Sequence, residues 1–512
     1  MGATSEPPAP AAPDTDDTPG SAKLPGLFAA PGFVRLWSAQ LVSSFGDWIG
    51  LLAIIEVARR IGGDRPGSAI ALVVTARVLP GFFLASAGGV IVDRFNRKRL
   101  LIGCDITRAL TMLSVPFINS LWGLVLASLM LELATSLWSP AKEAIVPNIV
   151  PARHLSAANS LGLLAAYGTF PLGAGAFAGL AKLGQWFGWD DIGQVETALV
   201  IDSATFLIAA MLIATLPLQH HAVRRERSAA PAGERRRINF AQGIQELREG
   251  WNFIFLSPQV RAVLIGLGTG MIGGGMVVPL GAVFADDVLG GGSAGFSSLL
   301  VAMGLGAGAG VGLVTAVQKH VSRSRTFVVA VFTAGGALVV VASVSSTLLA
   351  LAGVLALGIA AGAVYVSGFT LLHEHVDENL RGRVFSALYT LVRFCLLVAM
   401  AAGGFLSDGF NWLFDVLFDN SIGLGGLTLS LPGVRGALWL GGLLILLAGM
   451  LAAGSLHHAH AAEGAAGHGA DGPPDGSAGG PPDGPPDGSS GRDTSPDGPA
   501  GHGAGGPPHP SP

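Results

Sequence analysis

Charged residues are scarce in this chain. Asp, Glu, Lys and Arg together make up 12% of its 512 residues, against about 25% in ordinary soluble domains. A soluble globule of this length needs a charged surface that this composition does not supply. Cysteine is also rare: Cys104 and Cys395 are the only two, and both lie in apolar stretches. A disulfide framework is therefore excluded.

The sequence also lacks the motifs of ATP-driven and enzymatic chemistry. Gly304, Gly306 and Gly308 are spaced like part of a phosphate loop, but no Lys-Ser or Lys-Thr pair follows them and they lie within an apolar stretch. We interpret them as sites of close helix packing. The spacing of His373 and His375 does not suit one face of a helix, so we expect no metal site there. We expect no enzymatic activity and no cofactor.

Apolar residues, in contrast, are abundant and come in long blocks. Hydrophobic residues make up 50% of the chain, and the mean hydropathy is +0.56. Blocks of roughly 20 apolar residues can cross about 30 Å of hydrocarbon as helices. The sequence therefore predicts an all-α polytopic membrane protein with twelve transmembrane helices. The predicted spans are 36–58, 68–92, 100–118, 121–140, 156–182, 195–217, 258–284, 294–318, 326–345, 347–371, 384–406 and 436–455.

Lys and Arg are distributed unevenly over the predicted loops. If the N-terminus is cytoplasmic, eighteen of them fall in cytoplasmic loops and only five in outside loops. Loops rich in Lys and Arg are retained in the cytoplasm. We therefore predict that the protein lies in the inner (plasma) membrane of the cell with both termini cytoplasmic. The five outside residues are Arg59, Arg60, Arg65, Lys182 and Arg435.

Two loop sequences recur at one offset of about 226 residues. The basic loop at Asp93 has a counterpart at Lys319 to Arg325, and the loop 150–159 has one at 376–383. Two matches at one spacing indicate duplication, and hence two pseudo-symmetric six-helix halves, as in many secondary transporters. We predict a disordered cytoplasmic N-terminal tail (1–30), an N-terminal half (31–217), a cytoplasmic linker (218–252), a C-terminal half (253–456) and a disordered Gly/Pro/Asp-rich cytoplasmic tail (457–512).

Polar side chains form stripes at helical spacing within the predicted spans. An ionisable group at the centre of a span costs about 2.5–3.5 kcal/mol on insertion scales, so it usually has a partner or a role. For Asp47 and Glu132 two interpretations stay open: an ion pair with Arg77 that stabilises the bundle, or proton coupling and substrate contact. Asp105 and Arg108 are predicted to pair with each other. The stripes are Gln40, Ser43, Ser44 and Asp47; Ser128, Glu132, Thr135, Ser136 and Ser139; and Ser386, Tyr389, Thr390 and Arg393.

The loop from Gly89 to Arg99 places four cations and one acid between two spans. The cations are Arg94, Arg97, Lys98 and Arg99, and the acid is Asp93. Membrane orientation alone accounts for the cations. The spacing of the Asp93-Arg94 pair and the Arg97-Lys98 pair also indicates a gating loop. In it Asp93 contacts the positive end of a facing helix while the cytoplasmic end is closed.

Four segments of the chain resemble the major facilitator superfamily of secondary transporters. They are Leu36 to Asp47, Gly89 to Arg99, Ser139 to Asn159 and Arg381 to Phe385. The resemblance covers residues 31–456 and extends to the bacterial exporter branch that includes enterobactin and macrolide efflux proteins. It implies twelve helices, a rocking motion of the two halves and proton antiport.

Three places depart from the pattern of the superfamily. Asn96 replaces the glycine that is usual in the loop at Gly89. The second-half copy of the loop, at Lys319, lacks the Asp-Arg core. Antiporters of the superfamily carry a Gly-Pro motif, and its place here holds Pro171, Gly173 and Gly175, with Phe170 where glycine is expected.

The leading hypothesis is a secondary active transporter that exports a small amphiphilic compound by alternating access and proton antiport. Drugs, siderophores and secondary metabolites are such compounds. A lipid or lysolipid flippase of the same fold is one alternative, and a non-transporting membrane scaffold or sensor that acts through the C-terminal tail is another. The expected partners are a small-molecule substrate, protons and membrane lipids. We expect a monomer and no nucleic acid, since basic segments beside a membrane contact anionic lipid.

Overall fold

The computed structural model describes residues 28, 30–84, 92, 95–188, 191–216, 257–317, 321–376, 378–419, 421–424 and 427–468. It divides into two compact units, Met1–Ala462 and Glu463–Pro512, and everything below concerns the first. The described residues contain twelve helical stretches that are long and apolar enough to cross a membrane. The predicted twelve-helix architecture is confirmed.

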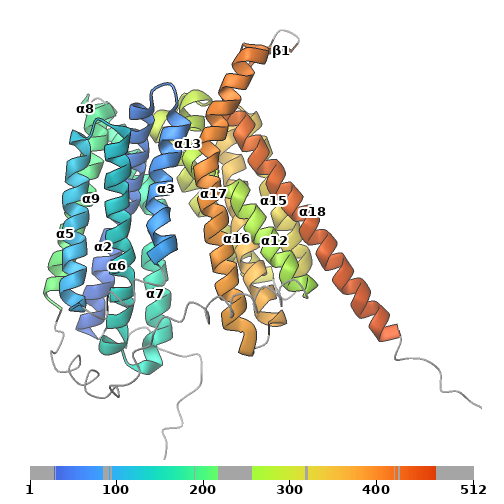
Figure 1. Cartoon of the computed structure of the whole chain (residues 1–512), viewed down its shortest axis with the longest axis horizontal. Helices are drawn as coiled ribbons and strands as arrows, with labels where there is room; N and C mark the ends of the chain where they lie inside the picture. The colour runs from blue at the N-terminus through green and yellow to red at the C-terminus, as the bar shows by residue number, and fades with distance from the viewer. Residues whose placement is uncertain are drawn as a thin grey trace, which may run out of the picture. The chain divides into compact units, whose positions relative to one another are not determined.

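The first half contains six of these stretches. Within it α2, α5, α6 and α9 lie side by side (Figure 1). One stretch is formed by two consecutive helices, α7 and α8, with Gly168 and Thr169 between them. The helices are α2 (Pro31–Gly62), α3 (Pro66–Leu84), α5 (Arg97–Ser114), α6 (Leu121–Ile149), α7 (Leu155–Tyr167), α8 (Phe170–Phe187) and α9 (Asp191–Ala214), with short 3-10 turns at Val115–Phe117 and Ala152–His154.

The second half repeats the count of six stretches, with α12 and α13 forming one of them. A feature that the sequence did not predict is a β-hairpin between α17 and α18, in which Ser421 pairs with Ser430. The sequence between its strands is Gly-Gly, a pair favoured in two-residue hairpin turns. The elements are α12 (Pro258–Gly275), α13 (Val277–Asp287), α14 (Gly292–Val317), α15 (Arg323–Ser343), α16 (Thr347–His375), α17 (Glu378–Phe418), β1 (Ser421–Leu424), β2 (Leu427–Ser430) and α18 (Gly433–His468).

Glycines allow α14 and α16 to pack backbone against backbone. Gly306 and Gly310 of α14 face Gly358 and Gly362 of α16, and a Cβ on any of the four would meet backbone atoms of the other helix. Small residues four apart permit such close approach of helices in membranes. Of the three glycines spaced like a phosphate loop, Gly306 therefore serves helix packing, as interpreted from the sequence.

The two halves meet through a few helix pairs. The main ones are α3 with α17, which lie side by side in Figure 1, and α8 with α14, while α13 also contacts α2 and α3. We call the end of the bundle where α3 begins the outer end, after the predicted orientation, and the opposite end the inner end. The contact between α3 and α17 includes the outer end, because a Cβ on Gly404 would meet the backbone of Gly67.

Candidate functional site

Asp47 lies inside the first half between two arginines from neighbouring helices. Its Oδ1 is 3.6 Å from Nη2 of Arg77 on α3, and its Oδ2 is 3.6 Å from Nη1 of Arg108 on α5. These distances are longer than those of charge-assisted hydrogen bonds, which are about 2.7–2.9 Å. The structure thus brings together Asp47 and Arg77, as one interpretation of the sequence expected, and adds Arg108.

Arg108 is held in a fixed position by its surroundings. It forms an ion pair with Asp105, as predicted from their spacing, and Asp105 also accepts a hydrogen bond of 3.3 Å from Nε1 of Trp138. The guanidinium lies 5.3 Å from the ring centroid of Trp138 and 4.4 Å from that of Phe206. Cation–π contacts of this kind stabilise a desolvated cation.

Asp202 of α9 is a fully buried carboxyl group beside this cluster. It rests on two glycines of α2: a Cβ on Gly46 or Gly50 would collide with its carboxylate. Its Oδ1 accepts a hydrogen bond of 3.3 Å from the hydroxyl of Thr205, and its Oδ2 has no hydrogen-bond partner among the described residues. From the sequence Asp202 is a weaker candidate than Asp47 and Glu132, and the spacing of Gly46 and Gly50 is a signal for close approach of another helix.

Glu132 of α6 completes the cluster. It lies within electrostatic range of Arg77 and Asp47, and its Oε1 is 3.2 Å from the place that a Cβ on Gly81 of α3 would take. Around these groups several polar atoms are buried without a hydrogen-bond partner in the described part of the chain. They are Thr75 Oγ1, Arg77 Nη1, Arg108 Nε and Ser128 Oγ.

We define the carboxyl cluster as Asp47, Asp105, Glu132 and Asp202 with Arg77 and Arg108. Among the described residues it contains four acids and two guanidinium groups. Ionisation of all four acids would leave two negative charges uncompensated. Buried charges without partners are costly, and so are buried polar atoms without hydrogen bonds. The cluster is therefore suited to bind protons or a cationic group.

Gln40, predicted to share a face with Asp47, serves another contact. Its Nε2 donates to the carbonyl oxygen of Gly162 on α7 at 3.0 Å. Its Oε1 lies 3.4 Å from Nζ of Lys142 on α6. These bonds connect α2 to α6 and α7, and neither of them involves the carboxyl cluster.

The predicted helix 5 motif lies on α8, on the sides that pack against α2 and α14. Its residues are Pro171, Gly173 and Gly175. A Cβ on Gly304 of α14 would lie 2.6 Å from Pro171, and one on Gly173 would lie 2.6 Å from the Cβ of Trp48 on α2. A Cβ on Gly175 would lie 3.8 Å from Val301 of α14, an ordinary van der Waals distance. Pro171 and Gly173 therefore lie at close contacts of α8 with α14 and α2, whereas Gly175 leaves room for a Cβ.

The predicted gating loop is described only in part. Gly89, Asp93 and Arg94 lie outside the described residues. Arg97 donates to the carbonyl oxygen of Ala144 at 2.9 Å, and Lys98 donates to that of Leu216 at 2.8 Å. These cations fix the start of α5 to the inner ends of α6 and α9. Asn96 is the N-cap of α5, and its side chain accepts a hydrogen bond from the N–H of Arg99 at 3.2 Å.

At the outer end, polar groups join the two halves. Asp408 of α17 accepts hydrogen bonds from the backbone N–H and the hydroxyl of Ser68, at 2.9 and 2.5 Å. It thereby caps the N-terminus of α3, which carries a partial positive charge. Arg59 of α2 contacts Oδ2 of Asp286 on α13 at 2.5 Å and also holds Glu56 through two bonds of 2.9 and 3.0 Å.

Aromatic side chains gather on α16 and α17. Ring centroids of Tyr365 and Phe369 are 4.5 Å apart, and Phe369 lies 5.8 Å from Phe385 and 6.2 Å from Tyr389. Tyr365 and Tyr389 are 56% and 50% exposed. Arg393, selected from the sequence, lies one turn beyond Tyr389 on α17 and is exposed. We call Tyr365, Phe369, Phe385 and Tyr389 the aromatic patch.

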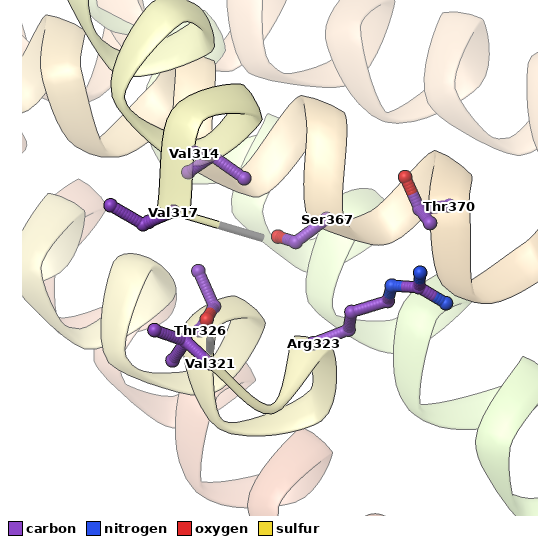
Figure 2. A pocket seen from close by; sticks show the side chains of 7 residues that line it. All are labelled: Val314, Val317, Val321, Arg323, Thr326, Ser367 and Thr370. Atoms are coloured by element: carbon purple, nitrogen blue, oxygen red, sulfur yellow. The ribbon is translucent and has the colours of Figure 1, made fainter. Parts of the chain in front are cut away.

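A small hollow of about 10 Å³, the size of one water molecule, lies between α14, α15 and α16 (Figure 2). Arg323, at the start of α15, and the hydroxyl groups of Ser367 and Thr370 on α16 lie around it. Arg323 forms an ion pair with Glu374 of α16. Because its one cation is already paired, we do not take this hollow as the functional site.

Comparison with known proteins agrees with the geometry. The chain is 24% identical over 394 residues to YfiS of Bacillus subtilis (strain 168), described as an uncharacterized MFS-type transporter; the match covers 74% of this chain and 87% of YfiS. It is 24% identical over 379 residues to the putative bacilysin exporter BacE of the same organism, covering 72% and 86%. Macrolide efflux protein A of Streptococcus pyogenes is 29% identical over 131 residues, which are 24% of this chain and 31% of that protein.

Solved structures show the same fold. A bacterial homolog of the human lysosomal transporter Spinster, in an inward-facing and occupied conformation, aligns with a TM-score of 0.60 at 14% identity, over 83% of this chain and 96% of that one. The D-xylose–proton symporter aligns with a TM-score of 0.59 at 13% identity, over 82% and 96%. The model of the Major Facilitator Superfamily matches residues 36–400. With its twelve helices in two halves, the chain is a multi-pass membrane protein that belongs to the Major Facilitator Superfamily of transporters.

Proposed function

We propose that this chain exports a small amphiphilic compound across the inner (plasma) membrane in exchange for protons. The observation that carries the proposal is the carboxyl cluster, in which four acids face two guanidinium groups inside the first half. A proton on Asp47 or Glu132 removes uncompensated negative charge from a site of low dielectric. A cationic group of a substrate does the same. Proton and substrate therefore compete for the same carboxyl groups, and such competition couples their movements in opposite directions.

Alternating access is supported by the contacts between the halves. Two contacts hold the halves together at the outer end. Asp408 accepts a hydrogen bond from the start of α3, and Arg59 contacts Asp286. We infer that in this state the carboxyl cluster is reached from the inner end. Opening the outer end separates Arg59 from Asp286, but Arg59 keeps its two bonds to Glu56 within α2. That retained partner lowers the electrostatic cost of opening.

The inner end is the proposed place of the second gate, formed by Gly89, Asp93, Arg94, Arg97 and Lys98. The proposed contact at the inner end has a parallel at the outer end, where Asp408 of α17 caps the start of α3. In our proposal Asp93, after the end of α3, caps the start of α17 in the opposite state. The two contacts would then be alternatives on one antiparallel helix pair.

Direction and location follow from charge and resemblance. The excess of Lys and Arg in the loops of the inner end supports cytoplasmic termini. Export is supported by two relatives that are described as exporters, macrolide efflux protein A and the putative bacilysin exporter. Drugs, siderophores and secondary metabolites are the proposed substrates, and a monomer is the proposed functional unit.

The test is substrate-dependent proton movement in proteoliposomes, measured with a pH-sensitive dye over a panel of amphiphiles. We expect Asp47→Asn and Glu132→Gln to reduce the coupled proton flux to the background of empty liposomes, because an amide cannot bind and release the proton. Glu143→Gln is the matched control, since Glu143 lies on the same helix as Glu132 and is exposed. Its flux should equal that of the unchanged protein.

Other outcomes assign the protein differently. Substrate movement that continues unchanged in both variants, with no response to a pH gradient, would contradict proton coupling and make the flippase hypothesis the better one. No solute movement in the full chain, together with loss of the protein's effect in cells when residues 457–512 are deleted, would indicate the scaffold.

A further inference from the structure

Arg393 is a cation inside a membrane span, and the described part of the chain supplies no counter-charge to it. It lies in the stretch Arg383–Phe418, it is exposed, and no ion pair or hydrogen bond of its side chain is found among the described residues. A charged side chain in a span faces a cavity, a pathway or a partner. The carboxyl cluster has the opposite imbalance, with more acids than cations.

The helix geometry places Arg393 opposite the carboxyl cluster. Gly404 of α17 meets Gly67 of α3 at the outer end. Arg393 precedes Gly404 by eleven residues, which is about three turns, so both lie on the same face of α17. Arg77 follows Gly67 by ten residues. At 1.5 Å per residue both arginines lie about 15 Å from this contact, so Arg393 faces the first half at the depth of Arg77 and its neighbour Asp47.

The aromatic patch lies beside Arg393 and faces the same way. Tyr389 is one turn from Arg393. Its ring contacts that of Phe369, which in turn contacts the ring of Tyr365. Tyr365 lies within electrostatic range of Tyr167, which belongs to α7 of the first half. Half-exposed tyrosines on a surface that faces the other half are available to a ligand between the halves, where flat rings stack well on aromatic side chains.

We propose that the transported compound is an aromatic zwitterion. Its basic group contacts Asp47 and Glu132, its ring packs on the aromatic patch, and its acidic group pairs with Arg393. The inference rests on the transport role proposed above and names the substrate class for that site. A compound with only a basic group would leave Arg393 unpaired when the site closes, and a compound with only an acidic group would face an excess of carboxylates. Because the site recognises both the basic and the acidic group of the compound, it disfavours each analogue that carries only one of them.

The experiment compares ring-matched triplets of aromatic amino acids and dipeptides. Each triplet consists of the zwitterion, its C-terminal amide and its N-acetyl derivative, and the panel varies the distance between the two charges. Binding to the purified full-length protein in detergent is measured by isothermal titration calorimetry. We expect at least one zwitterion to bind about 10- to 100-fold more tightly than its amide and its acetyl form, as one charge-assisted hydrogen bond implies.

Variants assign the recognition to Arg393. In Arg393→Gln the preferred zwitterion should fall to the affinity of its amide, while the affinity of the amide stays unchanged. Arg325→Gln removes the same charge at an exposed position on α15 and should preserve the preference. Equal weakening of all three members in Arg393→Gln, tighter binding of the amide, or no binding by any zwitterion of the panel would overturn the proposal. Because binding is measured without proton flux, failure of antiport leaves this order of affinities testable.

Discussion

Gly310→Leu is expected to leave almost no folded transporter in the membrane, whereas Gly308→Leu is expected to be tolerated. A Cβ on Gly310 would overlap the carbonyl group of Ile359, while one on Gly308 has no heavy atom within 4 Å. Overpacking of a core costs about 1–3 kcal/mol when side chains can adjust. Here the obstacle is the backbone of α16, which cannot rotate aside.

Fluorescence-detected size-exclusion chromatography of the solubilised protein measures this difference. The variants share one helix, one residue type and nearly one depth, so a general effect of leucine on membrane insertion would affect both. A monodisperse peak of equal height for Gly310→Leu and Gly308→Leu would contradict the backbone contact between α14 and α16. The smaller substitution Gly310→Ala should give an intermediate yield.

A disulfide between Ser68→Cys and Asp408→Cys is expected to stop transport completely, and reduction is expected to restore it. The two native side chains are in hydrogen-bond contact across the halves, and proposed alternating access requires them to separate in each cycle. The background should carry Cys104→Ala and Cys395→Ala, because these two are the only native cysteines. Coupled flux in proteoliposomes is measured before and after oxidation.

The single-cysteine proteins provide the control for this experiment. Asp408→Cys loses the cap of α3, and Ser68→Cys loses only the bond from the hydroxyl. Neither protein can form the cross-link, so oxidation should leave its flux unchanged. Full transport by protein that mass spectrometry shows to be cross-linked would contradict the assignment of the Ser68–Asp408 contact to the outer gate.

Helical spacing predicted one part of the candidate site well. The stripe that contains Asp47 had to face protein, and Arg77 on the next predicted span was the available cation. The spacing of Asp105 and Arg108 also predicted their ion pair, since residues three apart on a helix are neighbours. These contacts are local, or join spans that a short loop makes adjacent.

Contacts that depend on packing were beyond the same reasoning. Asp202 meets α2 only because Gly46 and Gly50 admit it, and Gln40 has the spacing of Asp47 yet bonds to Gly162 and Lys142. Ser68 and Asp408 are 340 residues apart, and nothing in either segment specifies the other. The hairpin after α17 could not be predicted from periodicity, because each of its strands has only four residues.

The small residues at the boundary between the halves bear on the rate of transport. Gly67 meets Gly404, and Gly304 meets Pro171 and Phe170, so at each of these points at least one half contributes a glycine and no long side chain. A rotation across such surfaces requires few rotamer changes and little local expansion, which keeps the activation free energy of the conformational change low. The turnover number is then governed by the release of Asp408 and Asp286 from their partners. It should rise modestly with ionic strength, because salt weakens the partly buried ion pair of Asp286 with Arg59.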